Sequence, residues 1–155
     1  MIDGVQVRRL NPIRDERGAL CELLRCDDPL FERFGQLYYT AVHPGYVKAW
    51  HRHRRQTDLM FAAAGPVRIA LYDAREASPT HGEVMEVLAG RDDPALVRIP
   101  PGVVHGFCAV SEETAVLLNV PDEPYDRGSP DEIRIDPFDN DIPYDWRAQG
   151  ARKGW

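Results

Sequence analysis

Two histidines one residue apart, followed five residues later by an aspartate, are the first residues in this chain that could do chemistry. These residues are His51, His53 and Asp58. Side chains two apart on a β-strand point to the same face, so both imidazoles should face one space. Imidazole and carboxylate groups can bind a transition metal or transfer a proton. The motif therefore predicts either a metal site or an acid/base site, and a plain polar strand is the third interpretation.

A second motif lies about fifty residues downstream, where Pro100, Gly102 and His105 follow a Pro-x-Gly-x-x-His spacing. Together the two segments resemble the two signature motifs of the cupin superfamily, with Asp58 at the position where that signature usually has glutamate. Metal-bearing cupins bind one divalent transition metal with the matching side chains. The resemblance thus implies a possible ligand set, namely His51, His53, Asp58 and His105.

Short apolar segments punctuated by glycine and proline predict an all-β domain of sandwich or barrel type. The predicted strands are GALCELLR, FGQLYYTAV, DLMFAAA, PVRIALYDA, GEVMEVLA, ALVRIP, HGFCAV and TAVLLNV. One short helix is expected in DDPLFERF, with Asp27 or Asp28 as its N-cap and Pro29 at its first position. With the cupin resemblance, the expected fold is a double-stranded β-helix, or jelly roll. Residues 1–155 are expected to form one domain, of which 147–155 fray.

The composition excludes several classes of partner. The chain has 19 basic and 25 acidic residues, a net charge of −6, and the two signs are mixed along it. Nucleic acids and anionic membranes favour clustered basic surfaces, so neither is expected as a partner. No apolar run is long enough to span a membrane, and the three cysteines fit neither a metal knuckle nor a disulfide framework. We expect a cytoplasmic protein.

A more specific resemblance covers residues 12–146. The segments RDERGALCE, YDAREASPTHGEVMEV, VRIPPGVVHGFCAVSEETAVLLNV and YDRGSPDEIRIDPFDNDIPYDW occur in this order. They resemble the dTDP-4-dehydrorhamnose 3,5-epimerase family of dTDP-rhamnose biosynthesis. The resemblance implies an isomerase that acts on a nucleotide sugar, without a cofactor or metal. It also implies proton abstraction beside a ketone by a histidine, and proton return by a tyrosine on the opposite face.

By motif position, His51 matches the family's catalytic base. His105 matches a second pocket histidine, Lys48 stands where the family has a phosphate-binding arginine, and Tyr125 matches an aromatic residue at the nucleotide end. Arg17 and Glu22 match residues that the family presents to the partner subunit on an exchanged N-terminal strand. The resemblance therefore implies a homodimer.

Three positions depart from the family pattern. Asn119 replaces the catalytic tyrosine, Asp58 replaces a lysine beside the enolate, and His53 replaces a glutamine. An amide cannot donate a proton as a phenol does, so another residue, such as Tyr39, Tyr72 or His53, has taken over or the chemistry differs. The family's base is oriented by a carboxylate from a C-terminal helical segment, which this chain has little room to supply.

A tyrosine pair, Tyr38-Tyr39, precedes His51-x-His53. This arrangement resembles that of dTDP-sugar 3,4-ketoisomerases, in which one base moves a proton through an enediol. We expect a sugar-nucleotide epimerase or ketoisomerase with His51 as the base. His53 and Asp58 are expected as further catalytic groups, and His105 and Asn119 complete the pocket lining. Two alternatives stay open: a metal-dependent cupin enzyme acting on another small molecule, and a nucleotide-sugar-binding cupin without turnover.

Overall fold

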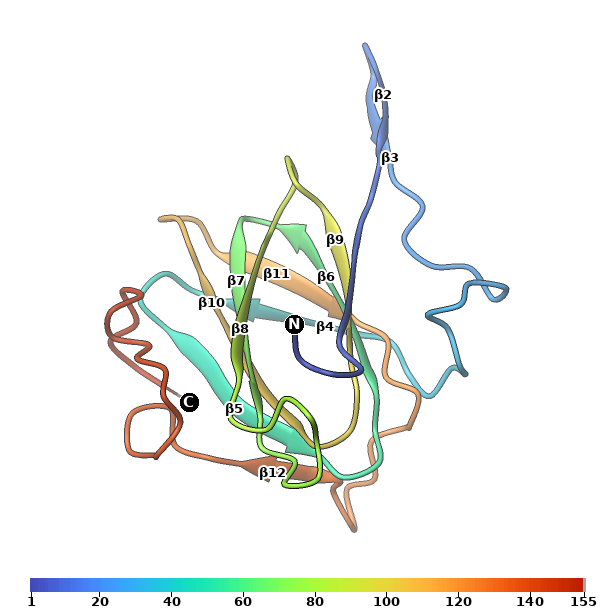
Figure 1. Cartoon of the computed structure of the whole chain (residues 1–155). Coiled ribbons are helices and arrows are strands. Elements are labelled where there is room, and N and C mark those ends of the chain that lie inside the picture. The colour runs from blue at the N-terminus through green and yellow to red at the C-terminus, as the bar shows by residue number, and fades with distance from the viewer. Residues whose placement is uncertain (155) are drawn as a thin grey trace.

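Two five-stranded antiparallel sheets face each other in the computed structural model, which describes residues 1–154 (Figure 1). The first sheet has the order β1-β9-β6-β11-β4. Its strands are β1 (Gln6–Arg9), β9 (Ala95–Ile99), β6 (Asp58–Ala64), β11 (Ala115–Asn119) and β4 (Tyr38–Val42). The second sheet has the order β12-β5-β10-β7-β8. Its strands are β12 (Glu132–Arg134), β5 (Val47–His53), β10 (Val103–Ala109), β7 (Val67–Asp73) and β8 (Val84–Ala89).

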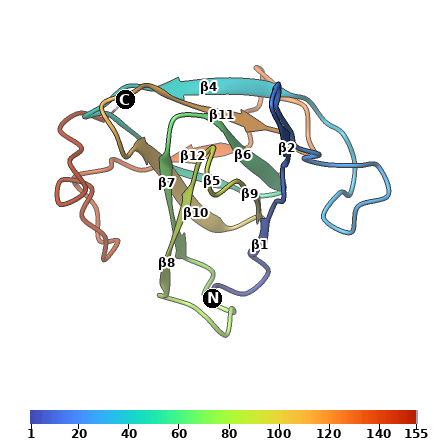
Figure 2. The ribbon, with the colours of Figure 1, turned by 90° about the horizontal axis from the view of Figure 1, so that it is seen from above.

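The remaining two strands, β2 (Ile13–Asp15) and β3 (Gly18–Leu20), pair only with each other. This hairpin projects away from the two sheets (Figure 1), and Figure 2 views the molecule from the side towards which it projects. The expected all-β cupin jelly roll is confirmed, and each of the eight predicted segments contains a strand.

Two apolar clusters pack against the second sheet from opposite sides. The inner cluster fills the space between the sheets and includes Ile69, Leu71, Val97 and Leu117, all fully buried. The outer cluster joins β5, β7 and β10 to the C-terminal segment, which runs outside β5 (Figure 1). Burial of apolar surface on both faces fixes this sheet and the side chains that it presents to the interior.

The predicted short helix is wrong, because residues 27–34 form only turns and irregular backbone. The side-chain Oδ1 of Asp28 accepts the backbone N–H of Leu30 at 2.9 Å, which is a turn bond rather than a helix cap. The same carboxylate pairs with Arg8 at 2.5 Å, and Leu30 packs against Leu59 and Leu96. These tertiary contacts hold the segment in a turn.

Residues near the C-terminus, which we expected to fray, are attached to the start of β5. The carbonyl of Gly45 accepts the N–H of Arg152 at 2.8 Å, and the carbonyl of Lys153 accepts that of Val47 at 2.9 Å. Ala151 is 3% exposed. The last residue of the expected frayed segment, Trp155, lies outside the described residues. Within residues 1–154, no helix is long and apolar enough to cross a membrane.

Candidate active site

A cavity of about 560 Å³ opens between the two sheets. Its wall includes five of the residues singled out from the sequence, which are Lys48, His51, His53, His105 and Tyr125. Two more, Asp58 and Asn119, are each 1% exposed and lie beneath this wall, where they contact lining residues. The predicted pocket is thus assembled around both histidine motifs.

A β-bulge in β5 determines which side chains face this cavity. His51 lies opposite His105, but Lys48 lies opposite Phe107, so Ala49 and Trp50 together oppose Gly106 alone. Ala49 and Trp50 both pack in the outer cluster, and Lys48 and His51 both line the cavity. Strict alternation along the strand would have sent Lys48 and His51 to opposite faces.

His51 is held by a carboxylate from outside its own sequence motif. Nδ1 of His51 lies 2.6 Å from Oε1 of Glu132 on β12, and both side chains are 18% exposed. The hydrogen bond with His51 lowers the pKa of Glu132 to about 2; burial opposes this shift and Arg134 adds to it. Glu132 is therefore ionised at neutral pH. The expectation that this chain has little room for an orienting carboxylate is corrected: Glu132 supplies one from β12.

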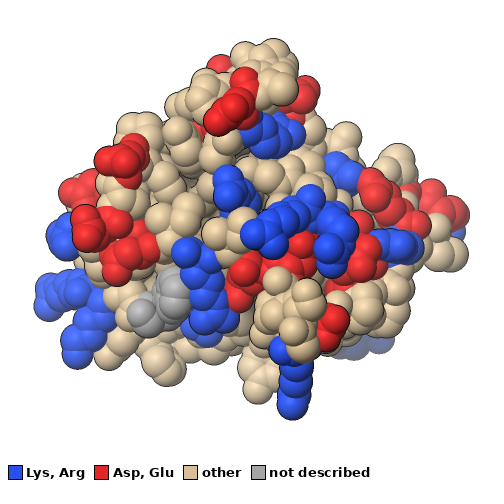
Figure 3. Space-filling view, turned by 90° about the horizontal axis from the view of Figure 1, so that it is seen from below, with Lys and Arg blue, Asp and Glu red and all other residues tan. Residues whose placement is uncertain are grey.

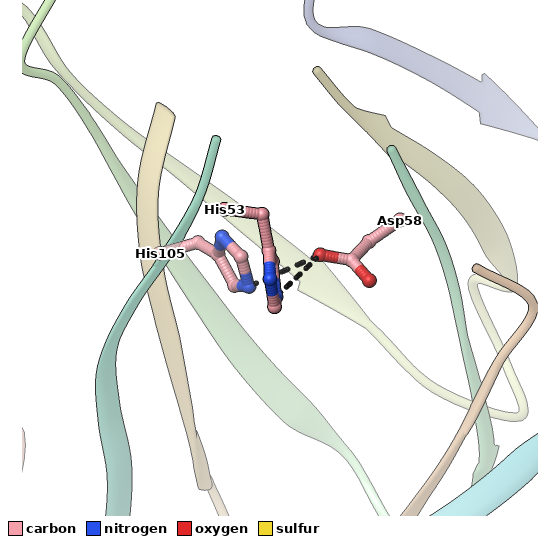
Figure 4. A group of neighbouring side chains, drawn as sticks. All are labelled: His53, Asp58 and His105. Atoms are coloured by element: carbon pink, nitrogen blue, oxygen red, sulfur yellow. Dashed lines mark ion pairs between the residues drawn. The ribbon is translucent and has the colours of Figure 1, made fainter. Parts of the chain in front are cut away.

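His53, Asp58 and His105 form a compact cluster (Figure 4). The ring centroid of His51 lies 6.1 Å from that of His105. Nε2 of His53 and Nε2 of His105 each lie 3.5 Å from Oδ2 of Asp58. Within residues 1–154 this oxygen accepts no hydrogen bond. The three ligand-type atoms lie within 4.8 Å of one another, so these residues could hold a metal ion. Burial lowers the pKa of His105, against the opposing charge of Asp58, and favours its neutral form.

The other oxygen of Asp58 joins this cluster to the first sheet. Oδ1 of Asp58 accepts hydrogen bonds from Gln56 at 2.8 Å and from Nδ2 of Asn119 at 2.7 Å. The same Nδ2 donates to the hydroxyl of Tyr38 at 2.9 Å. Burial raises the pKa of Tyr38 to about 12, with a further contribution from Asp58. A chain of hydrogen bonds therefore runs from the histidine cluster to a protonated phenol.

The tyrosines proposed from the sequence as substitutes lie elsewhere. Tyr39 is 73% exposed, and Tyr72 packs against the outer cluster behind the second sheet. Instead, Tyr38, the first residue of the tyrosine pair, lines the cavity. Tyr38 pairs with Asn119 on the neighbouring strand β11. Successive side chains of a strand point to opposite faces, so alternation alone predicts that only one of Tyr38 and Tyr39 can face the cavity.

Arg17 and Glu22 are not brought to the cavity of their own chain. The side chain of Arg17 is 85% exposed and pairs with Asp15 in the hairpin, and that of Glu22 is 65% exposed. Arg17 lies in the turn between β2 and β3, and Glu22 follows β3 by two residues; the hairpin itself projects away from the sheets (Figure 1).

Positive charge is available along the cavity wall. Lys48 and Arg55 line the wall, and Nζ of Lys48 donates to the hydroxyl of Thr40 at 2.8 Å. Acidic side chains lie beside the basic ones on the face seen from below, so no uniform basic surface forms there (Figure 3). This mixture suits a small ligand with a local anionic group better than a polyanion.

Comparison with known proteins gives a consistent result. The family model described as dTDP-4-dehydrorhamnose 3,5-epimerase matches residues 1–153. The chain is 40% identical over 149 residues to the spore coat polysaccharide biosynthesis protein SpsL of Bacillus subtilis, covering 96% of this chain and 99% of that protein. It is 42% identical over 151 residues to the probable low-salt glycan biosynthesis epimerase Agl13 of Haloferax volcanii, covering 96% of each.

Among solved structures, a dTDP sugar isomerase from Desulfovibrio desulfuricans is similar, with a TM-score of 0.88 and 38% sequence identity. The similarity covers 94% of this chain and 92% of the other.

Proposed function

Since the chain belongs to the dTDP-4-dehydrorhamnose 3,5-epimerase family, we propose that it inverts a carbon beside the ketone of a dTDP-4-keto-6-deoxyhexose-like nucleotide sugar. The chain is a sugar-nucleotide epimerase of the cupin fold, as its relatives are. The single observation that carries the proposed chemistry is the contact between His51 and Glu132 at the cavity wall.

A hydrogen beside a ketone is acidic because the carbanion left behind is delocalised onto the carbonyl oxygen as an enolate. We assign the Nδ1 proton of His51 to the hydrogen bond with Glu132, since the ionised carboxylate can only accept. That tautomer leaves Nε2 with the lone pair that accepts the substrate proton. The imidazolium that forms is then stabilised by Glu132 at 2.6 Å.

The same cavity offers complementary groups for the rest of the substrate. Lys48 and Arg55 supply positive charge for a diphosphate, although an ammonium lacks the bidentate geometry of a guanidinium. Tyr125, 53% exposed on the loop that follows β11, is available to stack on a base. These contacts would hold the sugar against His51.

We propose that this proton transfer needs no metal. His51 is oriented by Glu132, and no step of the base mechanism uses Oδ2 of Asp58. The cluster of His53, Asp58 and His105 nevertheless has ligand-type atoms within 4.8 Å of one another, so a test of the function must include removal of metal by a chelator. Family membership supports the epimerase interpretation over the non-catalytic one and over a metal-dependent cupin that acts on another small molecule.

The test is incubation of the protein with dTDP-4-keto-6-deoxyglucose in D2O, followed by NMR. We expect deuterium at C3, C5 or both, together with a new epimer, and we expect the same rate after treatment with a chelator. His51→Asn should lower the rate by about 100-fold or more, the usual contribution of a general base. His43→Asn is the matched control, because His43 is exposed and bonded to Thr114. A wild-type protein that binds this sugar but exchanges no hydrogen would contradict the proposal.

A further inference from the structure

Inversion of a carbon requires protons on both faces of the substrate. The enolate formed by proton abstraction is planar at the reacting carbon, so a proton returned by the same base restores the original configuration. Inversion therefore needs a second group, on the opposite face, that can donate a proton. His51 belongs to the sheet β12-β5-β10-β7-β8, and a ligand in the cavity lies between this sheet and the other one.

The opposite sheet contributes three described residues to the cavity wall, which are Tyr38, Thr40 and Met60. A thioether has no proton to donate, and an alcohol such as Thr40 is a much weaker acid than a phenol. Thr40 also accepts a hydrogen bond from Lys48. His53 and His105 lie on the same sheet as His51, so they approach from the side of the base. Among the cavity-lining residues of the opposite sheet, Tyr38 is therefore the group that can donate a proton.

Asn119 holds the hydroxyl of Tyr38 in a defined place. Oδ1 of Asn119 accepts the backbone N–H of Leu59 at 3.1 Å, and Nδ2 donates to Asp58 and to the oxygen of Tyr38. The amide is 1% exposed, so these bonds fix its orientation. Because Tyr38 accepts from Asn119, its own O–H is available as a donor toward the cavity. The same amide N–H would stabilise the phenolate after proton transfer.

We propose that Tyr38 is the catalytic acid that returns a proton to the substrate carbon on the face opposite to His51, an inference that rests on the epimerase function proposed above. The enolate electron pair forms the new C–H bond, the O–H bond of Tyr38 breaks, and the ketone is restored. The enzyme is left with a His51 imidazolium and a Tyr38 phenolate held by Asn119. Exchange of protons with water then returns both groups to their starting states.

Although Tyr38 as a whole residue is 40% exposed, burial of part of its side chain raises its pKa to about 12, so the phenol is protonated at neutral pH before reaction. The geometry also explains Asn119 at a position where a tyrosine would be expected. Tyr38 and Asn119 are cross-strand partners on β4 and β11, so the phenol is supplied from the adjacent strand and the amide secures it.

The test compares Tyr38→Phe with Tyr39→Phe in D2O, with the keto sugar used above. Both variants lose one hydroxyl from β4, but Tyr39 is 73% exposed and lies outside the cavity wall. We expect Tyr38→Phe to form epimer at least about 100-fold more slowly than wild type. His51 should still exchange the substrate hydrogen for deuterium, with the configuration of the carbon retained. Tyr39→Phe should behave as wild type. A thermal melt and a dTDP-binding measurement show whether each variant is folded and binds.

Two results would overturn the assignment while leaving the proposed function intact. One is epimer formation by Tyr38→Phe at the wild-type rate. The other is a folded, ligand-binding Tyr38→Phe variant that loses exchange as well as inversion, because an acid acting after enolate formation is not needed for proton abstraction. Failure of the wild-type protein to exchange any hydrogen would instead contradict the epimerase function itself.

Discussion

At the scale of single residues, Glu132 changes how the histidine motif is understood. The sequence places His51 in a cupin motif with Asp58 as the nearest carboxylate, but the partner found in the structure, Glu132, lies 81 positions away in a tail rich in aspartate and proline. Its carboxylate reaches Nδ1 of His51 at 2.6 Å. Because Glu132 contacts His51, we propose that it is a positioning residue for the base.

Replacement of Glu132 by glutamine should distinguish its effect on His51 from any effect on substrate binding. Glu132→Gln keeps the shape of the side chain but removes the charge that stabilises the imidazolium, so we expect kcat to fall about 10- to 100-fold with little change in KM. Deuterium exchange should slow by the same factor as epimer formation, because both follow proton abstraction. Glu113→Gln, an exposed change in the β10–β11 turn, is the control. An unchanged exchange rate in Glu132→Gln would show that His51 does not need this carboxylate.

At the scale of elements, the bulge in β5 lets one strand present both Lys48, the proposed phosphate-binding residue, and His51, the proposed base, to the cavity. Gly106 is the residue opposite the bulge, and a Cβ added there would lie 2.2 Å from the Cβ of Ala49 and 3.0 Å from the carbonyl oxygen of Lys48. No side chain fits in that space. Glycine at position 106 is therefore required for the bulge that places Lys48 and His51 at the cavity.

Substitution of Gly106 by alanine should therefore move β5 away from β10. We expect a loss of about 1–3 kcal/mol in the free energy of unfolding, the usual range for overpacking, measured by urea denaturation. We also expect epimerisation to fall about 100-fold through displacement of His51. Addition of Ala49→Gly to this variant removes the closest colliding atom and should recover part of both losses. Independent, additive effects of the two substitutions would contradict a steric origin.

At the scale of the whole molecule, a buried carboxylate connects the N-terminus, β7 and the loop that follows it. Asp73 is 0% exposed and bonds Arg75, Ser78 and Thr80, while Arg75 and Thr80 in turn bond the backbone of Asp3. Burial alone would raise the pKa of Asp73, but the hydrogen bonds from Arg75, Ser78 and Thr80 outweigh it and hold that pKa well below its usual range.

This depressed pKa predicts how the stability of the fold depends on pH. A carboxylate with a lower pKa in the folded state contributes stability above its unfolded pKa of about 3.9, and that contribution is lost as the pH falls further. We expect Asp73→Asn to lower the free energy of unfolding by about 2–4 kcal/mol at pH 7, because it breaks a buried ion pair. The difference from wild type should shrink below about pH 4. Denaturation at several pH values, with the exposed Asp92→Asn as control, checks this. A difference that is constant from pH 7 to pH 3 would contradict the argument.

The arm that contains β2 and β3 also belongs to this scale. It carries Arg17 and Glu22 away from the cavity of its own chain, and Ile13 and Leu20 on it are 73% and 64% exposed. An arm of this kind fits the expected exchange of N-terminal segments between two subunits. The homodimer and the cytoplasmic location stay predictions.

The sequence alone determined the all-β fold, the two histidine motifs and the family. These follow from local signals: apolar segments punctuated by glycine and proline, and residues at fixed spacing such as His51 and His105. The predicted helix near Asp28 failed because Arg8 and the pocket around Leu30 hold that segment as a turn, and no local signal reports such contacts.

Only the tertiary structure shows which residues could complete the proposed catalytic pair with His51 and supply the proposed acid. Glu132 and Tyr38 reach the cavity because β12 pairs with β5 and β4 pairs with β11 in one particular register. The bulge opposite Gly106 then turns both Lys48 and His51 inward. Strand pairing and register depend on how the whole core packs, so residues far apart in the chain become neighbours for reasons that no short stretch of sequence contains.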